Sequence, residues 1–337
     1  MPSFFLPTVA AIAAILFAGL LFKPTYPGPL APVAPGDAIV ITGTSTGIGK
    51  HVSLSLAKQG YTVFAGVRKQ QDGEALRQSA LHHGVDVDKI KILILDVTNS
   101  EHIQRAVETV SRHPGKMAGL FNNAGIGGEL ATGVISTAAE FTPMEEYRKV
   151  FDVNFFGLVA VTRAFLPLLR RDGGRIVMNS SIAGFIGGPF LASYVASKHA
   201  VEGFADGLRR ELLLARTGVR VAILECALVA TPILAGTIPA GREPYARAER
   251  RTARQFWKDA LTAAPPRVAS AAVAHALRAA RPRVRYVVGK DAAIIRWLRY
   301  LPGHWLDFLL LNDFTRKEIK DSELEALLHQ ARSEFEL

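Results

Sequence analysis

Short apolar runs alternate with longer amphipathic stretches between residues 37 and 290. The apolar runs predict buried strands at 38–42, 61–67, 91–95, from 120, at 176–178, 219–224 and 283–288. Between them, apolar residues recur at helical spacing, which predicts helices that include 50–59, 99–110, 268–280 and a long one starting near 192. Strands that alternate with helices indicate an α/β fold with a doubly wound parallel sheet of about seven strands.

The stretch from 176 to 215 carries the most suggestive polar residues. A buried strand at 176–178 breaks through serines and glycines before the long helix begins. On that helix Tyr194 and Lys198 lie four residues apart, so they share one face. Ser181 lies thirteen residues before Tyr194, just past the strand end, where open α/β sheets build their sites. We therefore expect a phenol, an ammonium and a hydroxyl to converge at one opening beside the strand end.

These three groups suit proton exchange at a carbon–oxygen bond. A free phenol has a pKa near ~10, and a neighbouring ammonium favours the phenolate. Tyr194 would then exchange a proton with a carbonyl or alcohol oxygen that Ser181 holds in place. Such chemistry accompanies hydride transfer when a nicotinamide cofactor is near. A tyrosine and a lysine at this spacing also occur by chance, and Ser180 is a rival for the hydroxyl role.

A glycine-rich turn follows the first strand. Gly43, Gly47 and Gly49 have the spacing G-x-x-x-G-x-G between a strand and a helix. This arrangement is typical of a Rossmann fold, in which the backbone approaches a pyrophosphate and the helix N-terminus offers free N–H groups. The alternative is that the glycines serve only the turn.

Arg68 comes directly after the second strand, where this fold meets the adenosine ribose. An acidic residue there would bind a 2′-hydroxyl, whereas arginine accommodates a 2′-phosphate. The sequence therefore favours NADP(H) over NAD(H). The alternative is that Arg68 and Lys69 are a solvated charge pair.

Residues 4–22 are apolar and carry no charge. At 1.5 Å per residue they span about 28 Å as a helix, close to the thickness of a bilayer core. We expect a membrane anchor over 1–23 and a Pro- and Gly-rich linker over 24–36. A cleaved signal peptide is the rival, but no Lys or Arg precedes the run. The predicted location is an endomembrane such as the endoplasmic reticulum, with the catalytic domain in the cytosol.

Composition adds few constraints. The 337 residues suffice for one α/β domain with tails, and 49% of them are hydrophobic. The net charge of +10 is compatible with nucleic acid, anionic lipid or a phosphorylated cofactor. Since no nucleic-acid motif is present, we expect no nucleic-acid partner. Cys226 is the only cysteine, which excludes an intrachain disulfide, and the histidines show no metal-ligand pattern.

In order and spacing, these motifs resemble the short-chain dehydrogenase/reductase family over residues 37 to 235. The matching residues are Thr42, Gly43, Gly47, Ile48, Gly49, Asp96, Val97, Asn122, Asn123, Ala124, Gly125, Asn154, Ser181, Tyr194 and Lys198. The carboxy-terminal region, with RPRVRYVVGKDA before it, resembles the retinol and 17-beta-hydroxysteroid dehydrogenase branch.

The resemblance implies a role for each residue. Asn154, Ser181, Tyr194 and Lys198 would be catalytic, with Tyr194 as the acid/base and Asn154 holding a water. Lys198 would also bind the nicotinamide ribose and, with Tyr194, belong to the cofactor site. The remaining cofactor-binding residues would be Thr42, Gly43, Ser45, Thr46, Gly47, Ile48, Gly49, Arg68, Asp96, Val97, Asn123, Ala124, Gly125 and Thr231. From the residues alone, Asn154 and Asp96 also fit capping positions.

Two segments depart from the family pattern. Cys226 and Ala227 stand where the family usually has Pro-Gly, and the region 127–141 is longer than usual. A helical region is also expected within 236–258. The apolar tail, in the segment 291–337, would pack on the domain, cap a greasy substrate or lie at a membrane surface.

These expectations describe an NADP(H)-dependent oxidoreductase that interconverts a ketone or aldehyde and an alcohol. A lipophilic substrate such as a steroid, retinoid or long-chain lipid is the first hypothesis. A 3-ketosphinganine or 3-oxoacyl reductase is the second, and a non-catalytic NADP-binding scaffold is the third. A homodimer is compatible with the sequence.

Overall fold

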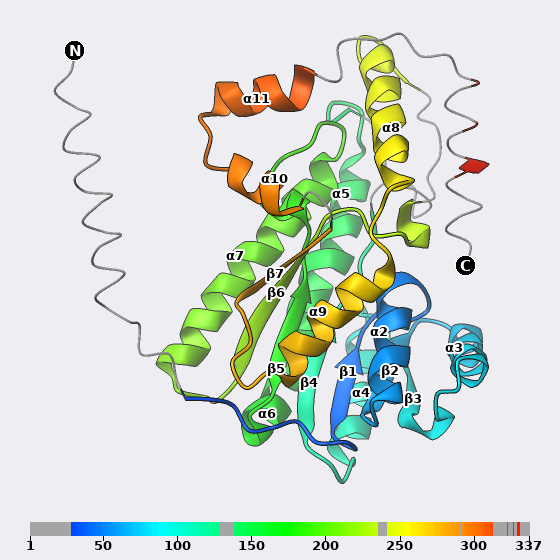
Figure 1. The fold of residues 1–337 in the computed structure, drawn as a ribbon, viewed down its shortest axis with the longest axis vertical. Helices are drawn as coiled ribbons and strands as arrows, with labels where there is room; N and C mark the ends of the chain where they lie inside the picture. The colour runs from blue at the N-terminus through cyan, green and yellow to red at the C-terminus, as the bar shows by residue number, and fades with distance from the viewer. Residues whose placement is uncertain are drawn as a thin grey trace, which may run out of the picture.

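A computed structural model describes residues 28–127, 138–234, 241–289 and 292–312, with residues 322, 326, 329 and 330. Its centre is a seven-stranded sheet in the order β3-β2-β1-β4-β5-β6-β7, with every pair parallel (Figure 1). The strands are β1 Ala38–Ile41, β2 Thr62–Val67, β3 Ile90–Ile94, β4 Met117–Asn122, β5 Arg175–Asn179, β6 Arg220–Cys226 and β7 Arg285–Val288. The chain direction across the sheet reverses between β1 and β4, which is where this fold binds ligands.

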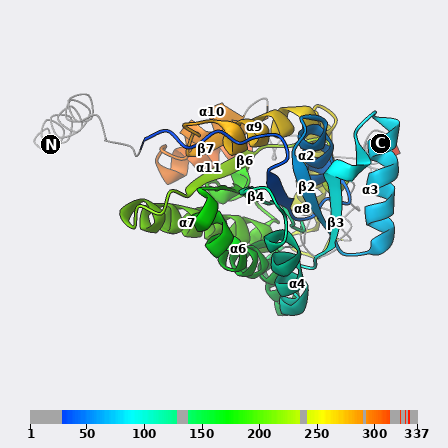
Figure 2. The ribbon, with the colours of Figure 1, turned by 90° about the horizontal axis from the view of Figure 1, so that it is seen from below.

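Helices cover both faces of the sheet (Figure 2). One face carries α2 Gly47–Lys58, α3 Gln70–His82 and α9 Pro266–Arg278, and the other carries α4 Ser100–Ser111, α6 Leu158–Asp172 and α7 Ala192–Leu214. Beyond the carboxyl ends of the strands lie α5 Met144–Phe151, α8 Ala246–Ala260, α10 Ala292–Leu298 and α11 Gly303–Asn312 (Figure 1). Single turns are η1 Val87–Lys89, η2 Asp152–Gly157, η3 Ile182–Gly184 and η4 Pro232–Leu234.

The sheet separates two hydrophobic cores. The first joins alternate strand residues such as Ile39 and Val177 to Leu56 of α2 and Leu277 of α9. The second packs the opposite strand faces against α4, α6 and α7, with Phe165 fully buried. Because both faces are covered, β1, β2 and β4 are buried along their whole lengths, which is why they read as continuous apolar runs.

The predicted order of elements is confirmed, and the differences lie at element ends. Strand seven begins at Arg285 rather than 283, and β6 extends to Cys226 rather than ending at 224. The helix after the glycine turn begins at Gly47, three residues before the predicted start, because the turn itself forms its first residues. The long helix begins at Ala192 as predicted.

The described part of the predicted linker, residues 28–36, contacts the domain. Leu30 is buried, and its N–H donates to the carbonyl of Ala280 at 2.9 Å. The Arg175 side chain donates to the carbonyl of Ala31 at 2.8 Å, and Gly36 N–H donates to Gly60. Residues 28–36 are therefore docked across the amino-terminal edge of the sheet (Figure 1). The predicted anchor over 1–23 lies outside the described residues.

Among the described residues, one helical stretch is long and apolar enough to cross a membrane. It is Met144–Asp172, which joins α5, η2 and α6. Val161, Phe165 and Leu169 of this stretch are buried in the second core. This packing accounts for its hydropathy, so the stretch carries no argument for a membrane span.

Candidate active site

Three of the proposed catalytic side chains meet at the carboxyl ends of β5 and β6. Ser181 caps η3 directly after β5, and its Oγ donates to the carbonyl of Cys226 at 3.2 Å. Tyr194 lies in the first turn of α7, within hydrogen-bonding reach of Ser181. Lys198 follows one turn later, with Nζ 5.5 Å from the centroid of the Tyr194 ring. The neighbouring Ser180 Oγ is buried and has no hydrogen-bond partner among the described residues, so the contacts to Tyr194 and Cys226 favour Ser181.

Burial is the main cause of the pKa shifts of Tyr194 and Lys198. It raises the pKa of Tyr194 to about 12, although the hydrogen bond with Ser181 acts in the opposite direction. It lowers the pKa of Lys198 to about 8. Because desolvation outweighs the hydrogen bond with Ser181, the phenol pKa is raised overall, and the expected fall is not found for the protein by itself. The Lys198 Nζ donates to the carbonyl of Asn179 at 2.8 Å.

Asn154 lies in the turn η2, which is π-helical, between α5 and α6. Its buried side chain accepts from Ile126 N–H at 2.8 Å and donates to the Ile126 carbonyl at 3.0 Å. It also donates to Ser197 Oγ at 3.1 Å, between Tyr194 and Lys198 on the same helix. The widened turn therefore aims Asn154 at the loop after β4 and at α7 together.

The glycine turn is locked to the end of β4. Thr42 Oγ1 accepts from Asn123 N–H and Ala124 N–H, each at 2.9 Å. Asn123 Nδ2 donates to the carbonyls of Thr42 and Gly43 at 3.0 and 2.8 Å. A Cβ on Gly43 would lie 2.8 Å from Ala124 Cα. These contacts fix the two strand ends on either side of the switch point.

The residues of the turn fit a pyrophosphate. Gly47 has a φ of +57°, and a Cβ on Gly49 would clash with the carbonyl of Gly43, so both positions require glycine. The α2 N-cap is Thr46, whose side chain makes no capping hydrogen bond, and the first turn holds no acidic residue. The N–H groups at this helix start are thus free to bind an anion. Ser45 and Ile48 complete the turn, with Ile48 packed against the first core.

Arg68 and Asp96 end the strands that flank the predicted adenosine site. Arg68 is exposed at the end of β2. Asp96 follows β3, and its Oδ1 accepts from Thr98 N–H at 2.9 Å and Thr98 Oγ1 at 2.7 Å. Desolvation raises the Asp96 pKa, but the Thr98 hydrogen bonds and the charge of Arg68 lower it overall. Val97 is buried against Gly157, where a Cβ would lie 2.6 Å from it.

Gly125 and Thr231 close the site. A Cβ on Gly125 would lie 3.2 Å from Asn154 Oδ1 and 3.8 Å from Lys198 Nζ. Thr231 is buried, and its Cβ lies 3.2 Å from the position of a Cβ on Gly47. The loop with Cys226 and Ala227 in place of Pro-Gly therefore still brings Thr231 to the glycine turn. The predicted long loop at 127–141 lies largely outside the described residues.

Asn179, the last residue of β5, also belongs to this site, although the sequence motifs do not include it. Its carbonyl accepts from Lys198, and its Nδ2 donates to Asn123 Oδ1 at 3.1 Å. It thereby connects α7 to the glycine turn. An asparagine that ends a buried apolar strand was the available signal.

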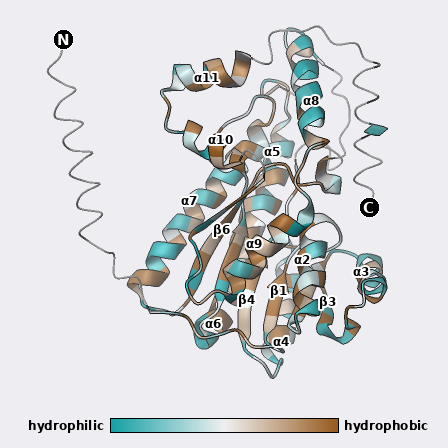
Figure 3. Cartoon of the chain, in the orientation of Figure 1, coloured by the Kyte–Doolittle hydropathy of each residue, from teal (hydrophilic) through white to brown (hydrophobic). Residues whose placement is uncertain are grey.

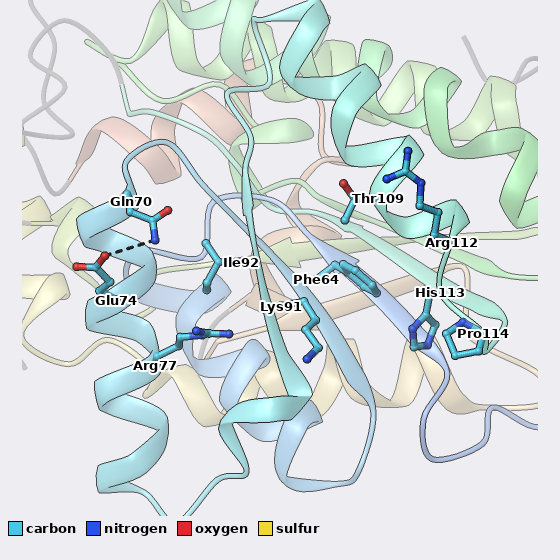
Figure 4. Close-up of a pocket in the computed structure, with 10 residues that line it drawn as sticks. All are labelled: Phe64, Gln70, Glu74, Arg77, Lys91, Ile92, Thr109, Arg112, His113 and Pro114. Atoms are coloured by element: carbon cyan, nitrogen blue, oxygen red, sulfur yellow. Dashed lines mark hydrogen bonds between the residues drawn. The ribbon is translucent and has the colours of Figure 1, made fainter.

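A separate hollow of about 560 Å³ lies at the open edge of the sheet, over β3 and between α3 and α4 (Figure 4). Its lining includes Arg77, Lys91 and Arg112, while Gln70 donates to Glu74 at 3.4 Å. None of the proposed catalytic or cofactor-binding residues lines it. The hollow is therefore not the site assembled at the strand ends.

Comparisons with known proteins agree with this geometry. Residues 37–240 match the family model described as short chain dehydrogenase. The chain is 32% identical to Dehydrogenase/reductase SDR family member 9 of Bos taurus, over 81% of this chain and 86% of that protein. It is 32% identical to Retinol dehydrogenase 5 of Mus musculus, over 81% of this chain and 87% of that one.

Two further similarities concern part of the chain or its fold. D-beta-hydroxybutyrate dehydrogenase, mitochondrial, of Mus musculus is 39% identical over 58% of this chain, and the match spans 55% of that protein, about half its length. A short chain dehydrogenase from Burkholderia cenocepacia J2315, solved in complex with NADP, superposes with a TM-score of 0.62 at 26% identity, over 82% of this chain and 98% of that one. The chain belongs to the short-chain dehydrogenase/reductase family, within the branch that includes the retinol dehydrogenases.

Proposed function

We propose that the protein is an NADP(H)-dependent oxidoreductase that acts on CH–OH groups and interconverts an alcohol with a ketone or aldehyde. The observation that carries this proposal is the meeting of Ser181, Tyr194 and Lys198 at the strand ends, beside the glycine turn. The family membership and the resemblance to named dehydrogenases support the same chemistry.

Each side chain has a defined task in this proposal. The Tyr194 hydroxyl exchanges a proton with the substrate oxygen, and the Ser181 Oγ hydrogen-bonds that same oxygen and orients it. A tyrosine with a pKa of about 12 holds its proton at neutral pH, which suits donation to the oxygen of a carbonyl undergoing reduction. Lys198, held by Asn179, places a positive charge beside the phenol ring.

The cofactor residues follow from the same geometry. The bound nicotinamide cofactor supplies or accepts the hydride. We propose that the turn from Thr42 to Gly49 binds its pyrophosphate and that Arg68 pairs with a 2′-phosphate. The exposed guanidinium at the end of β2 supports NADP(H), as does the NADP complex of the structural relative. Asp96, Val97, Asn123 to Gly125, Lys198 and Thr231 complete the proposed site.

The substrate is proposed to be lipophilic, such as a steroid, a retinoid or a long-chain lipid. The similarity to Retinol dehydrogenase 5 over most of both chains supports this class. The similarity to D-beta-hydroxybutyrate dehydrogenase favours a second candidate, a 3-hydroxy or 3-oxo acid, which includes 3-oxoacyl reduction. The similarity to 3-ketodihydrosphingosine reductase of Bacteroides thetaiotaomicron, 37% identical over 52% of this chain and 58% of that protein, supports 3-ketosphinganine reduction as an alternative.

We also propose that residues 4–22 anchor the protein in an endomembrane such as the endoplasmic reticulum, with the catalytic domain in the cytosol. The uncharged run is the supporting observation. A homodimer is proposed as well, in line with the family membership. Sedimentation of the detergent-solubilised chain tests the dimer.

A substrate screen tests the function. The full chain in membrane fractions is assayed with NADPH or NADP and a panel of steroids, retinoids, long-chain ketones and 3-oxo acids, following the absorbance of reduced nicotinamide. Turnover on a lipophilic member supports the proposal, and turnover confined to 3-oxo acids supports the second candidate. Binding of NADP(H) without turnover on any compound would indicate a non-catalytic scaffold.

A further inference from the structure

Glu202 lies one helical turn beyond Lys198 on α7. Tyr194, Lys198 and Glu202 follow one another at intervals of four residues, so they share one side of the helix. Figure 3 shows that hydrophilic and hydrophobic residues alternate along the length of α7. A carboxylate therefore follows the proposed catalytic phenol and ammonium on the same side of this helix.

The Glu202 carboxylate is largely enclosed by protein. Its side chain is 12% exposed, and a Cβ on Gly184 would lie 3.0 Å from Glu202 Cγ and 3.1 Å from the carbonyl oxygen of Lys198. The turn η3, which Ser181 caps, thus packs directly against this part of α7. Because little water surrounds the carboxylate, its charge acts on neighbouring groups more strongly than an exposed charge would.

Arg285 of β7 binds one oxygen of this carboxylate. Its Nη2 lies 3.0 Å from Glu202 Oε2 and 3.1 Å from Asp206 Oδ2. Its Nε lies 2.8 Å from the buried Glu225 of β6. The other oxygen, Glu202 Oε1, is buried and has no hydrogen-bond partner among the described residues. Arg285 therefore fixes the carboxylate in place and leaves its second oxygen without a hydrogen bond.

The polar groups that contact Lys198 from the strand ends are neutral. On β5, the acceptor for its Nζ is the carbonyl of Asn179. On the side of β4 and η2, a Cβ on Gly125 would lie 3.8 Å from this Nζ and 3.2 Å from the amide oxygen of Asn154. These groups can bind the ammonium, but none of them supplies a compensating negative charge.

The ionisable groups near Lys198 differ in their charge at neutral pH. Burial raises the pKa of the Cys226 thiol on β6 to about 12, and it raises the pKa of Tyr194 to the same value. Both groups are therefore uncharged at pH 7. Glu202 also acts on Lys198, and as a carboxylate paired with an arginine it is charged. Of these three groups, Glu202 alone can stabilise the ammonium at neutral pH.

We propose that Glu202 is a positioning residue for the proposed reaction: its carboxylate, held by Arg285, keeps the Lys198 side chain charged beside Tyr194. Burial opposes that charge and lowers the Lys198 pKa to about 8, whereas the Glu202 carboxylate acts in the opposite direction. The effect of Glu202 on turnover rests on the proposed function. Its effect on the charge of Lys198 does not.

A pH profile of reduction tests the kinetic consequence. Glu202→Gln removes the charge and keeps the shape of the side chain, and Arg285 retains Asp206 and Glu225, so we expect the variant to fold. The full chain is assayed with NADPH and a ketone from the substrate screen. We expect the alkaline fall in kcat/KM to move to lower pH by roughly half a unit or more, with the plateau below it retained. Glu202→Asp, which keeps the charge, should leave the fall near its wild-type position.

Glu211→Gln is the matched control for net charge. Glu211 is exposed on the same helix, thirteen residues after Lys198, so its removal should leave the profile unchanged. A purely structural role of Glu202 would lower kcat/KM by the same factor at every pH. An alkaline fall that stays in place in Glu202→Gln would therefore overturn the proposal.

An unfolding experiment decides the proposal without any turnover. The free energy of unfolding is measured with and without Lys198→Met, in wild type and in Glu202→Gln, as the pH rises. The difference isolates the titration of Lys198, since the lysine-containing chain gains stability above the folded Lys198 pKa. We expect this gain to begin at lower pH in the Glu202→Gln background. A gain that begins at the same pH in both backgrounds would overturn the proposal. If the gain moves but no substrate is turned over, the proposed function fails and the effect of Glu202 on Lys198 stands.

Discussion

The Nζ atom of Lys198 donates a 2.8 Å hydrogen bond to the carbonyl oxygen of Asn179, the last residue of β5. This bond ties α7 to the strand end and holds a buried ammonium in place. Burial lowers the pKa of Lys198 to about 8, so the folded protein pays to keep this side chain charged at neutral pH. A group retained at such a cost is typical of a functional site.

Lys198→Met should raise the free energy of unfolding at pH 7 while abolishing turnover. The lowered pKa corresponds to at most about 3 kcal/mol. The unfolded chain binds more protons than the folded one between pH 8 and the ordinary lysine pKa of 10.5, so wild-type stability rises through that window. The gain in unfolding free energy of the variant over wild type should therefore be largest below pH 8 and should shrink above pH 8. Urea unfolding across this pH range measures it.

Lys258→Met is the control for that experiment, because Lys258 is exposed on α8. It should change stability little at any pH. A Lys198→Met variant that is less stable than wild type at pH 7 would show that the bond to Asn179 outweighs the cost of burial.

Arg68→Asp should weaken NADPH binding by roughly 10- to 100-fold, about 1.4–2.8 kcal/mol. The physical reason is the loss of a cation, and the gain of an anion, beside the 2′-phosphate proposed to bind at the end of β2. Binding of NADH, which lacks that phosphate, should change far less. Titration calorimetry with both cofactors measures the difference, and Arg105→Asp on α4 is the control for net charge. Equal weakening of the two cofactors would refute the role of Arg68.

Arg285→Met should destabilise the protein by roughly 3 kcal/mol or more, since Glu225 is fully buried beside it. Burial, the charge of Glu202 and then the arginines set the Glu225 pKa, which is raised overall. Without Arg285 the carboxylate should take up a proton more readily in the folded state, so the deficit should shrink as the pH falls. Chemical unfolding of the single variant and of Arg285→Met/Glu225→Gln checks this. A double variant no more stable than the single one would exclude Glu225 as the source of the cost.

The sheet was predictable because its strands are buried on both faces. Runs such as Ala38–Ile41 have no polar alternation and can only lie in a core. The helix α7 was equally predictable, and Tyr194 and Lys198 share one of its faces at a spacing of four residues. The position of Ser181 after β5 then followed from the rule that parallel strands end at one edge.

Properties that depend on distant neighbours were not predictable. The phenol pKa was expected to fall because Tyr194 and Lys198 are near in sequence, but desolvation and the bond to Asn179 depend on how α7 packs against β5. The ion pair between Arg296 and the buried Glu225 likewise joins residues that are seventy-one positions apart in the sequence. Docking of Leu30 against Ala280 likewise joins the two ends of the domain.

The central claim is that the Tyr194 hydroxyl exchanges the proton at the substrate oxygen. Tyr194→Phe removes only that hydroxyl, and its effect on kcat with the substrate found in the screen is the most direct measurement. We predict a loss of at least roughly 10²-fold, with NADPH binding and the free energy of unfolding close to those of wild type. Turnover retained within about threefold of wild type would contradict it.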